Sequence, residues 1–233
     1  MFMRHKDALA RIMLLASLAL LSATLSGCVL ATVRTLNEDV EAKQGFTGAA
    51  YVAEIWDSRV LPTYDEQAQD LPALLALLAQ DQQAAIDQFG HRSGTGPYSF
   101  MVRGQARVLD FDTSSRTGLL ILDFEPADGT ADASLVVGPL IRISQRAAVR
   151  DAVGFIEYGS FVNQQEFADV ANAMGDRITA MIAEALGANT VEAIRELDPA
   201  QIEGKLVRFV GAMTYDDPNN IVVVPVRLEV VES

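Results

Sequence analysis

The sequence predicts an α+β protein, mainly antiparallel β, in which a duplicated small β-barrel module carries packed amphipathic helices. Two observations carry this prediction. Several short segments alternate apolar and polar side chains, and two long segments repeat apolar side chains every three or four residues. The order strand, acidic turn and apolar strand occurs twice, near residues 100–124 and 205–230, and short antiparallel strands must close or be covered to protect their edges. A single domain with one curved sheet is the competing interpretation.

The chain begins with the pattern of a bacterial secretion signal, residues 1–27. Three basic residues precede the apolar run Ile12–Leu25, which is shorter than the about 20 residues that a membrane-spanning helix needs. The tetrapeptide Leu25-Ser26-Gly27-Cys28 closes the run and resembles the lipobox of bacterial lipoproteins. We therefore predict cleavage before Cys28 and lipidation of its thiol, which would attach the mature protein to a membrane facing the periplasm. Ordinary secretion with a leftover cysteine is the alternative.

Charge and cysteine content restrict the classes of protein to which this chain can belong. Of the 18 basic and 31 acidic residues, three and one lie in the signal, so the mature part carries a net charge of −15. An acidic surface repels phosphate backbones, and we therefore expect no nucleic-acid partner. Because Cys28 is the only cysteine, the exported part has no disulfide and must be held by a hydrophobic core.

In the first part of the mature chain, the sequence predicts a stalk, a strand or bent segment, and a helix. Residues 28–45 read as a lipidated N-terminus and stalk with apolar residues at helical spacing. Phe46–Trp56 is expected to be a strand or a bent segment, and Pro62 to end any regular element nearby. Between Asp70 and Gly90 apolar residues recur at helical spacing, which predicts one amphipathic helix.

The middle of the chain predicts three antiparallel strands, at Phe100–Val108, Gly118–Phe124 and Ala133–Val137. The alternation changes phase after Val108, where apolar Leu109 follows directly. A one-residue β-bulge would explain this slip.

The last third predicts a long helix and two strands. Asp151–Tyr158 is expected to be helical or irregular, and Asn163 can cap a helix that runs to Gly187. Strands are expected at Lys205–Thr214 and Ile221–Val230. In the second of these strands Pro225, which lacks an amide donor, indicates an edge or a bulge.

Several stretches together resemble a bacterial family of predicted periplasmic lipoproteins that is catalogued as a domain of unknown function. The stretches that carry the resemblance are Ile55-Trp56-Asp57-Ser58 with Val60-Leu61-Pro62, Tyr98-Ser99-Phe100, Asp112-Thr113-Ser114-Ser115-Arg116, Val137-Gly138-Pro139-Leu140-Ile141-Arg142, Arg150-Asp151-Ala152, and Phe161-Val162-Asn163-Gln164 with Phe167-Ala168. The resemblance implies tandem OB-like barrels, and it implies genes that often neighbour those of sugar-type ABC importers. The expected domains are thus residues 46–160, a first OB-like module with a helix, and residues 161–233, a long helix with a second module that shares strands with the first.

Catalytic residues are scarce in this sequence. His91 is the only histidine outside the signal, so neither a catalytic triad nor a zinc site is expected. Asp216 and Asp217 form a visible carboxylate pair, but the run Asp-Asp-Pro-Asn-Asn is typical of a turn. A further acidic set does not match the spacing of a calcium loop, and it consists of Asp110, Asp112 and Asp123. We therefore expect no enzyme activity, no metal and no cofactor.

The candidate ligand or partner site consists of five polar residues around the start of the long helix: Arg142, Arg150, Asp151, Asn163 and Gln164. Arginine presents a planar fork of donors that suits carboxylates or hydroxyl-rich ligands. The competing interpretation is a structural Arg–Asp pair and a helix cap. Trp56 and Tyr51 could stack on a sugar ring, or they could fill the core. Met174 and Met181 are expected in the core, as part of the apolar stripe of the long helix.

From the lipobox, the missing catalytic set and the resemblance, we expect a non-catalytic binding or accessory lipoprotein. Its expected partners are the membrane and an ABC importer subunit or solute-binding protein. An envelope assembly lipoprotein that binds another protein is the first alternative. A carbohydrate-active hydrolase is the second alternative.

Overall fold

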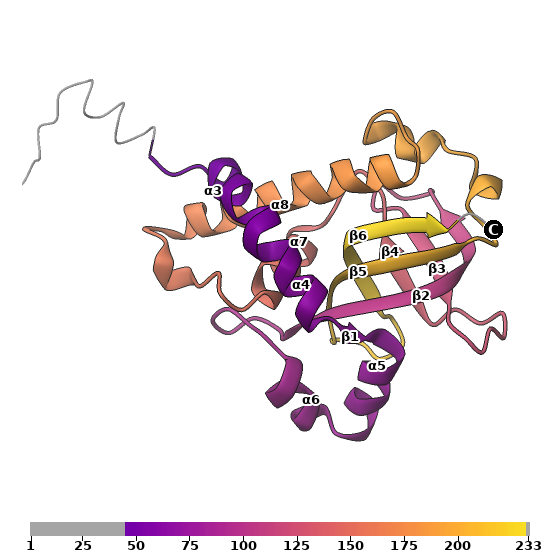
Figure 1. Ribbon diagram of the computed structural model, residues 1–233, viewed down its shortest axis with the longest axis horizontal. Helices are drawn as coiled ribbons and strands as arrows, with labels where there is room; N and C mark the ends of the chain where they lie inside the picture. The colour runs from indigo at the N-terminus through magenta and orange to yellow at the C-terminus, as the bar shows by residue number, and fades with distance from the viewer. Residues whose placement is uncertain (1–44, 232–233) are drawn as a thin grey trace, which may run out of the picture. The chain divides into compact units, whose positions relative to one another are not determined.

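One long strand, β2 (Ser99–Asp112), connects the two ends of the β-sheet in this structure, a computed structural model that describes residues 45–231 (Figure 1). The first part of β2 pairs antiparallel with β5 (Leu206–Thr214), and its last part pairs antiparallel with β3 (Leu119–Asp123). A strand that serves two partners in succession has to bend, and β2 therefore sets the curvature of the sheet.

The remaining pairings complete a ring of strands. β3 pairs antiparallel with β4 (Ala133–Val136), β4 pairs parallel with β6 (Val222–Val231), and β6 pairs antiparallel with β5. The short strand β1 (Gln69–Asp70) lies parallel to β2. The mixed α+β class is confirmed, but two tandem barrels are not. Strands from 46–160 and from 161–233 belong to one six-stranded sheet, because β5 closes the ring on β2.

Two register shifts keep the apolar side chains on the inner face. The pairing of β2 with β3 skips Leu109, which confirms the bulge predicted from the phase change. The pairing of β5 with β6 skips Val226, directly after Pro225, so the predicted bulge at this proline is confirmed as well. Without the first bulge, Val108 and Phe111, which are 1% and 2% exposed, would point to opposite faces of the sheet.

The longest helix, α8 (Gln164–Ala185), has the ends that its sequence predicts. The Oδ1 of Asn163 accepts the amide of Glu166 at 2.9 Å, and Gly187 follows the helix with a φ of +73°. One stripe of the helix is buried: Phe167, Val170, Met174, Ile178 and Ile182. This stripe faces β6 and two helices, so α8 joins the sheet to the helical layer (Figure 1).

The prediction for Phe46–Trp56 is wrong, because this segment opens a helical rod. The rod consists of α3 (Gly48–Ile55), a π-helical turn (Trp56–Val60) and α4 (Leu61–Gln67). Thr47 caps its start through a 3.2 Å hydrogen bond from the amide of Ala50. Apolar side chains every fourth position form its buried face: Val52, Trp56, Val60 and Tyr64.

Pro62 lies inside this rod and does not end it. A proline in an α-helix removes one hydrogen bond and clashes with the carbonyl four residues earlier. Here the preceding turn is wider, and the amide of Leu61 donates to the carbonyl of Trp56, five residues back. The π turn therefore accommodates the proline while the rod continues.

The helix predicted between Asp70 and Gly90 is two helices, α5 (Leu71–Gln80) and α6 (Gln82–Phe89). Asp81 interrupts it in an extended conformation, and its carboxylate caps α6 by accepting the amide of Ala84 at 3.0 Å. Apolar spacing does not reveal such an internal cap. The sequence also does not reveal most of α7 (Ile143–Ala152), whose first turn is polar or exposed.

The remaining chain forms short 3₁₀ turns, at Tyr158–Ser160, Glu192–Glu196 and Pro199–Gln201. Within residues 45–231 no helix is long and apolar enough to cross a membrane. The predicted signal, Cys28 and the stalk up to residue 44 lie outside the described residues.

Gly48 tests how closely the rod approaches α8. A Cβ on Gly48 would overlap the backbone carbonyl of Asp169, so Gly48→Ala should lower the free energy of unfolding by about 1–3 kcal/mol. Helix propensity alone predicts the opposite sign, a gain of up to about 1 kcal/mol. Urea denaturation measures the difference, with the exposed Ala49→Ser as control. A stabilised Gly48→Ala variant would contradict the close packing of α3 on α8.

Candidate functional site

The structure brings Arg150 and Asp151 together in a buried pair at the end of α7. The Nε and Nη2 atoms of Arg150 both lie 2.8 Å from Oδ1 of Asp151, and its Nη1 donates to the carbonyl of Phe167 at 2.9 Å. The guanidinium also stacks on the ring of Phe167 at 3.4 Å from its centroid, and only 7% of Arg150 is exposed. These contacts match the structural pair that was the competing interpretation.

Burial outweighs attraction in this pair. Desolvation raises the pKa of Asp151, and the attraction of Arg150 offsets only part of that effect. Desolvation likewise lowers the pKa of Arg150. The hydroxyl of Tyr64 donates to the carbonyl of Val149 at 2.9 Å next to this pair, and burial, followed by the charge of Asp151, raises the pKa of Tyr64.

The other three predicted residues lie elsewhere. Arg142 is the N-cap residue at the opposite end of α7, where its amide donates to Oε1 of Gln145 at 2.9 Å, eight residues or about 12 Å of helix from Arg150. It is exposed and lines a cavity of about 200 Å³ together with Asp216 and Asp217. Asn163 caps α8, and Gln164 is an exposed residue at the start of that helix. The five predicted residues therefore do not surround one cavity.

Three of the acidic candidates, Asp217, Asp112 and Asp123, accept hydrogen bonds from the turns next to them. Asp217 accepts the amide of Asn219 at 2.9 Å, and Asp112 accepts the amide of Ser114 at 2.8 Å. Hydrogen bonding from the side chain of Ser114, followed by that from its backbone amide, lowers the pKa of Asp112. Asp123 is buried and accepts the amide of Gly129. Within the described part of the chain, no group of three or more His, Cys, Asp or Glu side chains could hold a metal.

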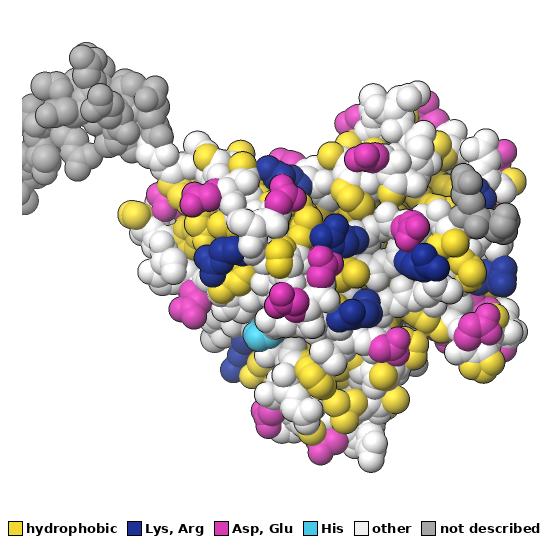
Figure 2. All heavy atoms as spheres, in the orientation of Figure 1, with side chains coloured by type: hydrophobic (Ala, Val, Ile, Leu, Met, Phe, Trp, Pro, Cys, Tyr) yellow, Lys and Arg dark blue, Asp and Glu magenta, His cyan; other side chains and the backbone are white. Residues whose placement is uncertain are grey.

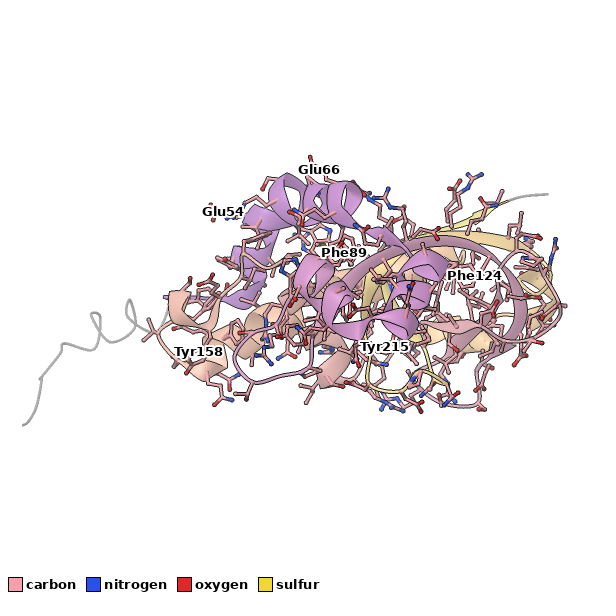
Figure 3. All side chains as sticks on the ribbon, turned by 90° about the horizontal axis from the view of Figure 1, so that it is seen from below. Glu54, Glu66, Phe89, Phe124, Tyr158 and Tyr215 are labelled. Atoms are coloured by element: carbon pink, nitrogen blue, oxygen red, sulfur yellow. The ribbon has the colours of Figure 1, made fainter. Side chains whose placement is uncertain are left out.

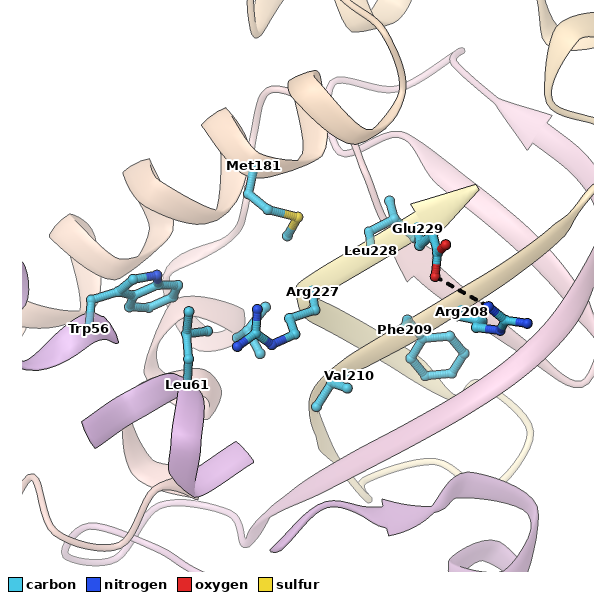
Figure 4. A pocket seen from close by; sticks show the side chains of 10 residues that line it. Trp56, Leu61, Met181, Arg208, Phe209, Val210, Arg227, Leu228 and Glu229 are labelled. Carbon is cyan, nitrogen blue, oxygen red and sulfur yellow. Dashed lines mark ion pairs between the residues drawn. The ribbon is translucent and has the colours of Figure 1, made fainter. Parts of the chain in front are cut away.

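A groove of about 420 Å³ lies between the helical rod, α8 and the β5–β6 hairpin (Figure 4). Trp56 and Leu61 lie on its helical side, Met181 reaches over it from α8, and the strands form the opposite side. We call this cavity the Trp56 groove. It combines segments that are far apart in the sequence, near positions 56, 181, 209 and 227.

The π turn explains why Trp56 lies in this groove. Trp56 is the first residue of the widened turn, and its side chain is 6% exposed. It thus forms the floor of the groove and does not project from it. Single π-helical turns within α-helices occur frequently at functional sites.

Two ion pairs border the apolar floor. Arg227 makes a bidentate pair with Asp65, with Nε–Oδ1 and Nη2–Oδ2 distances of 2.8 Å, and this bonding raises the pKa of Arg227. Arg208 donates to Gln105 at 2.8 Å and lies 3.5 Å from Glu229 (Figure 4). Each arginine at the border of the groove is therefore matched by one carboxylate. Basic and acidic side chains also alternate over the rest of this face (Figure 2).

Sequence reasoning found Trp56 as a candidate and missed the rest of the groove. Met181 was assigned to the core, yet it is half-buried and lines the cavity. The alternation in β5 and β6 was the available signal, since Arg208 and Arg227 occupy outward positions beside apolar neighbours. Tyr51 does not line this groove; it packs against Phe46 and Phe161.

Comparisons with known proteins concern both family and fold. The family described as "Predicted periplasmic lipoprotein (DUF2291)" matches residues 18–229. Among solved structures, the chain is similar to the crystal structure of an OB-fold protein from Thermotoga maritima, with a TM-score of 0.58 and 17% sequence identity. That similarity covers 80% of this chain and 99% of the other, and at this identity it concerns the fold alone. No curated protein matches the sequence.

The raised pKa of Asp151 gives a pH dependence with a defined sign. Because the folded-state pKa lies above the unfolded value, the folded protein binds the proton more tightly than the unfolded chain. The stability that Asp151 contributes is therefore fully present below its unfolded pKa and is lost as pH rises through the folded value. The free energy of unfolding of the wild type minus that of Asp151→Asn should fall as pH rises from 3 to 6, measured by urea denaturation. A difference that grows with pH would contradict the dominance of desolvation.

Proposed function

We propose that this chain, which belongs to the family of predicted periplasmic lipoproteins, is a lipid-anchored, non-catalytic binding component associated with a sugar-type ABC importer. Membership of this family confirms the resemblance inferred from the sequence. It also agrees with a location in the bacterial envelope, facing the periplasm. The activity, the ligand and the partner are the proposed parts.

The Trp56 groove is the observation that carries the proposal. Its volume of about 420 Å³ lies within the range of small-molecule sites, and its lining is largely apolar and includes the aromatic residues Trp56 and Phe209. Guanidinium and carboxylate groups on its border can exchange hydrogen bonds with hydroxyl groups. An apolar floor with a bidentate polar border suits a ring that has apolar faces and hydroxyls at its edge, as a sugar has.

The same groove supports a role without catalysis. Hydrolysis of a glycosidic bond requires one carboxyl group that carries a proton and a second that is ionised. The carboxylates at the Trp56 groove, Asp65 and Glu229, are each engaged by an arginine. Both carboxylates thus take part in ion pairs, which supports a role of the groove in binding.

Association with an importer rests on the implied gene neighbourhood and on the proposed ligand class. A lipid anchor would hold the domain at a membrane surface, where a solute passes between a binding protein and a permease. The envelope assembly role remains the alternative, and it would place a protein segment in place of a solute against the groove.

Binding to the Trp56 groove can be read from the protein itself, because Trp56 is the only tryptophan. Titration of the lipidated protein with a panel of mono- and disaccharides should produce a saturable change in tryptophan emission with at least one sugar. Arg227→Gln should weaken that binding about 10- to 100-fold, since a hydrogen bond to a charged group contributes about 1.5–3 kcal/mol. The exposed Arg116→Gln, with the same charge change, should bind as the wild type does. Emission unchanged by every sugar would refute a sugar site in this groove.

The anchor and the importer can be tested together in cells. Cys28→Ala should move the protein from the membrane fraction to the soluble periplasmic fraction, because the diacylglycerol acceptor is lost. Cross-linking followed by mass spectrometry should recover a permease or solute-binding protein with the anchored form, and not with Cys28→Ala. Recovery of envelope-assembly proteins would favour the alternative, and continued membrane attachment of Cys28→Ala would refute lipidation.

A further inference from the structure

An aromatic cluster lies where the described chain begins. Phe46, Tyr51 and Phe161 surround one another with ring centroids 5.4–5.7 Å apart, and Phe161 and Tyr158 each lie 5.5 Å from Phe167. We call these five residues, with the adjoining Val162, the aromatic corner. Tyr158 lies at the end of the molecule opposite Phe124 (Figure 3).

The aromatic corner is incompletely buried. Val162 is 89% exposed and Tyr158 is 51% exposed, while Phe46, Tyr51 and Phe161 are half-buried. A single exposed apolar side chain is ordinary, but here an exposed valine and tyrosine adjoin three half-buried rings. Tyrosine combines an apolar body with a polar tip and is enriched where protein meets the membrane interface.

The corner is held rigidly by the structure beneath it. Gly48 permits close contact between α3 and the backbone of α8 at Asp169. The carboxylate of Glu166 accepts the backbone amide of Val162 at 3.1 Å and the side-chain amide of Asn163 at 3.4 Å, so the exposed turn is tied to α8. Phe167 is fixed from below by the guanidinium of Arg150. A preformed apolar surface loses little conformational freedom on contact with a partner.

The short stretch of sequence between the predicted lipid anchor and this surface identifies what the surface contacts. Phe46 follows the predicted acylated Cys28 by 18 residues, a length of chain that spans at most about 65 Å. Phe46, in the aromatic corner, is the second residue of the described chain and thus one of the described residues nearest to the predicted anchor along the sequence. A tethered surface meets its target at a high effective concentration, so a weak apolar contact suffices. We propose that the aromatic corner docks on the membrane that carries the anchor, with Val162 and Tyr158 entering the lipid interface.

Charge specifies the kind of lipid surface. Glu157 is exposed next to Tyr158, and the mature chain is acidic overall. Anionic lipid headgroups would repel both, so the contact is to zwitterionic lipid and depends on apolar and aromatic side chains.

Docking at the aromatic corner sets the position of the Trp56 groove. Met181 lies 14 residues beyond Phe167 on α8, about 21 Å along the helix axis. The Met181 end of the groove therefore stands away from the lipid and stays accessible to the periplasm. This arrangement holds whatever the groove binds.

The experiment uses the full lipidated protein with a single added cysteine. Lipidation occupies the sulfur of Cys28, so a thiol-reactive, environment-sensitive fluorophore attaches only to Val162→Cys. The matched control carries the fluorophore at Ala79→Cys, an exposed site on α5. Both proteins are placed in vesicles of phosphatidylethanolamine and phosphatidylcholine, with and without nitroxide-bearing lipids. Because both sites are exposed, neither label disturbs the core.

The expected result is a blue shift and a severalfold rise in emission at position 162, with strong quenching by the nitroxide lipids. The label at position 79 should show the emission of a water-exposed fluorophore and little quenching. Equal exposure to water at both positions would overturn the proposal. A shift at position 162 that disappears when the protein is diluted at constant lipid would also overturn it, since a second copy of the chain would then be the occupant.

Discussion

The helical layer depends on the buried guanidinium of Arg150. It neutralises Asp151 on its own helix, bonds the carbonyl of Phe167 in the first turns of α8, and stacks on that residue's ring. The hydroxyl of Tyr64, on the rod, donates to the carbonyl of Val149 and so attaches the rod to the same junction. Loss of one partner from a buried ion pair costs about 3–5 kcal/mol, so this junction holds three helices in one arrangement. The groove and the aromatic corner both take their geometry from it.

The sheet supplies the second constraint. β6 contacts α8, and β5 contacts α7 and α4, so one face of this hairpin lies against the helices. α8 covers part of that face, and the rod covers another part. The Trp56 groove is the space that remains between them, which explains its apolar floor and its charged border. The strand residues that line the groove are mostly apolar, and Arg208 and Arg227 are the basic residues among them.

Features that depend on neighbouring residues could be predicted from the sequence, and several others could not. The cap at Asn163, the stop at Gly187 and the bulge at Leu109 were predictable, since each depends on a few neighbouring residues. The rod was not predictable, because the hydrogen bonds of its π turn compensate locally for Pro62, which by propensity alone ends a helix. The break at Asp81 was hidden for a similar reason, because apolar spacing continues across the cap.

The sequence by itself determined the class of the protein: an exported, lipidated chain of acidic surface, with an α+β fold and few residues suited to catalysis. Export signals, charge and periodicity are properties of contiguous residues, so no fold is needed to read them. Only the tertiary structure decided that Arg150 and Asp151 form a buried junction and that Trp56 meets Met181 and Arg227 in a groove. Trp56, Met181 and Arg227 are separated by many tens of positions, and Arg150 meets the carbonyl of Phe167 only in the folded chain. Their proximity results from ring closure and helix packing, which no local pattern encodes.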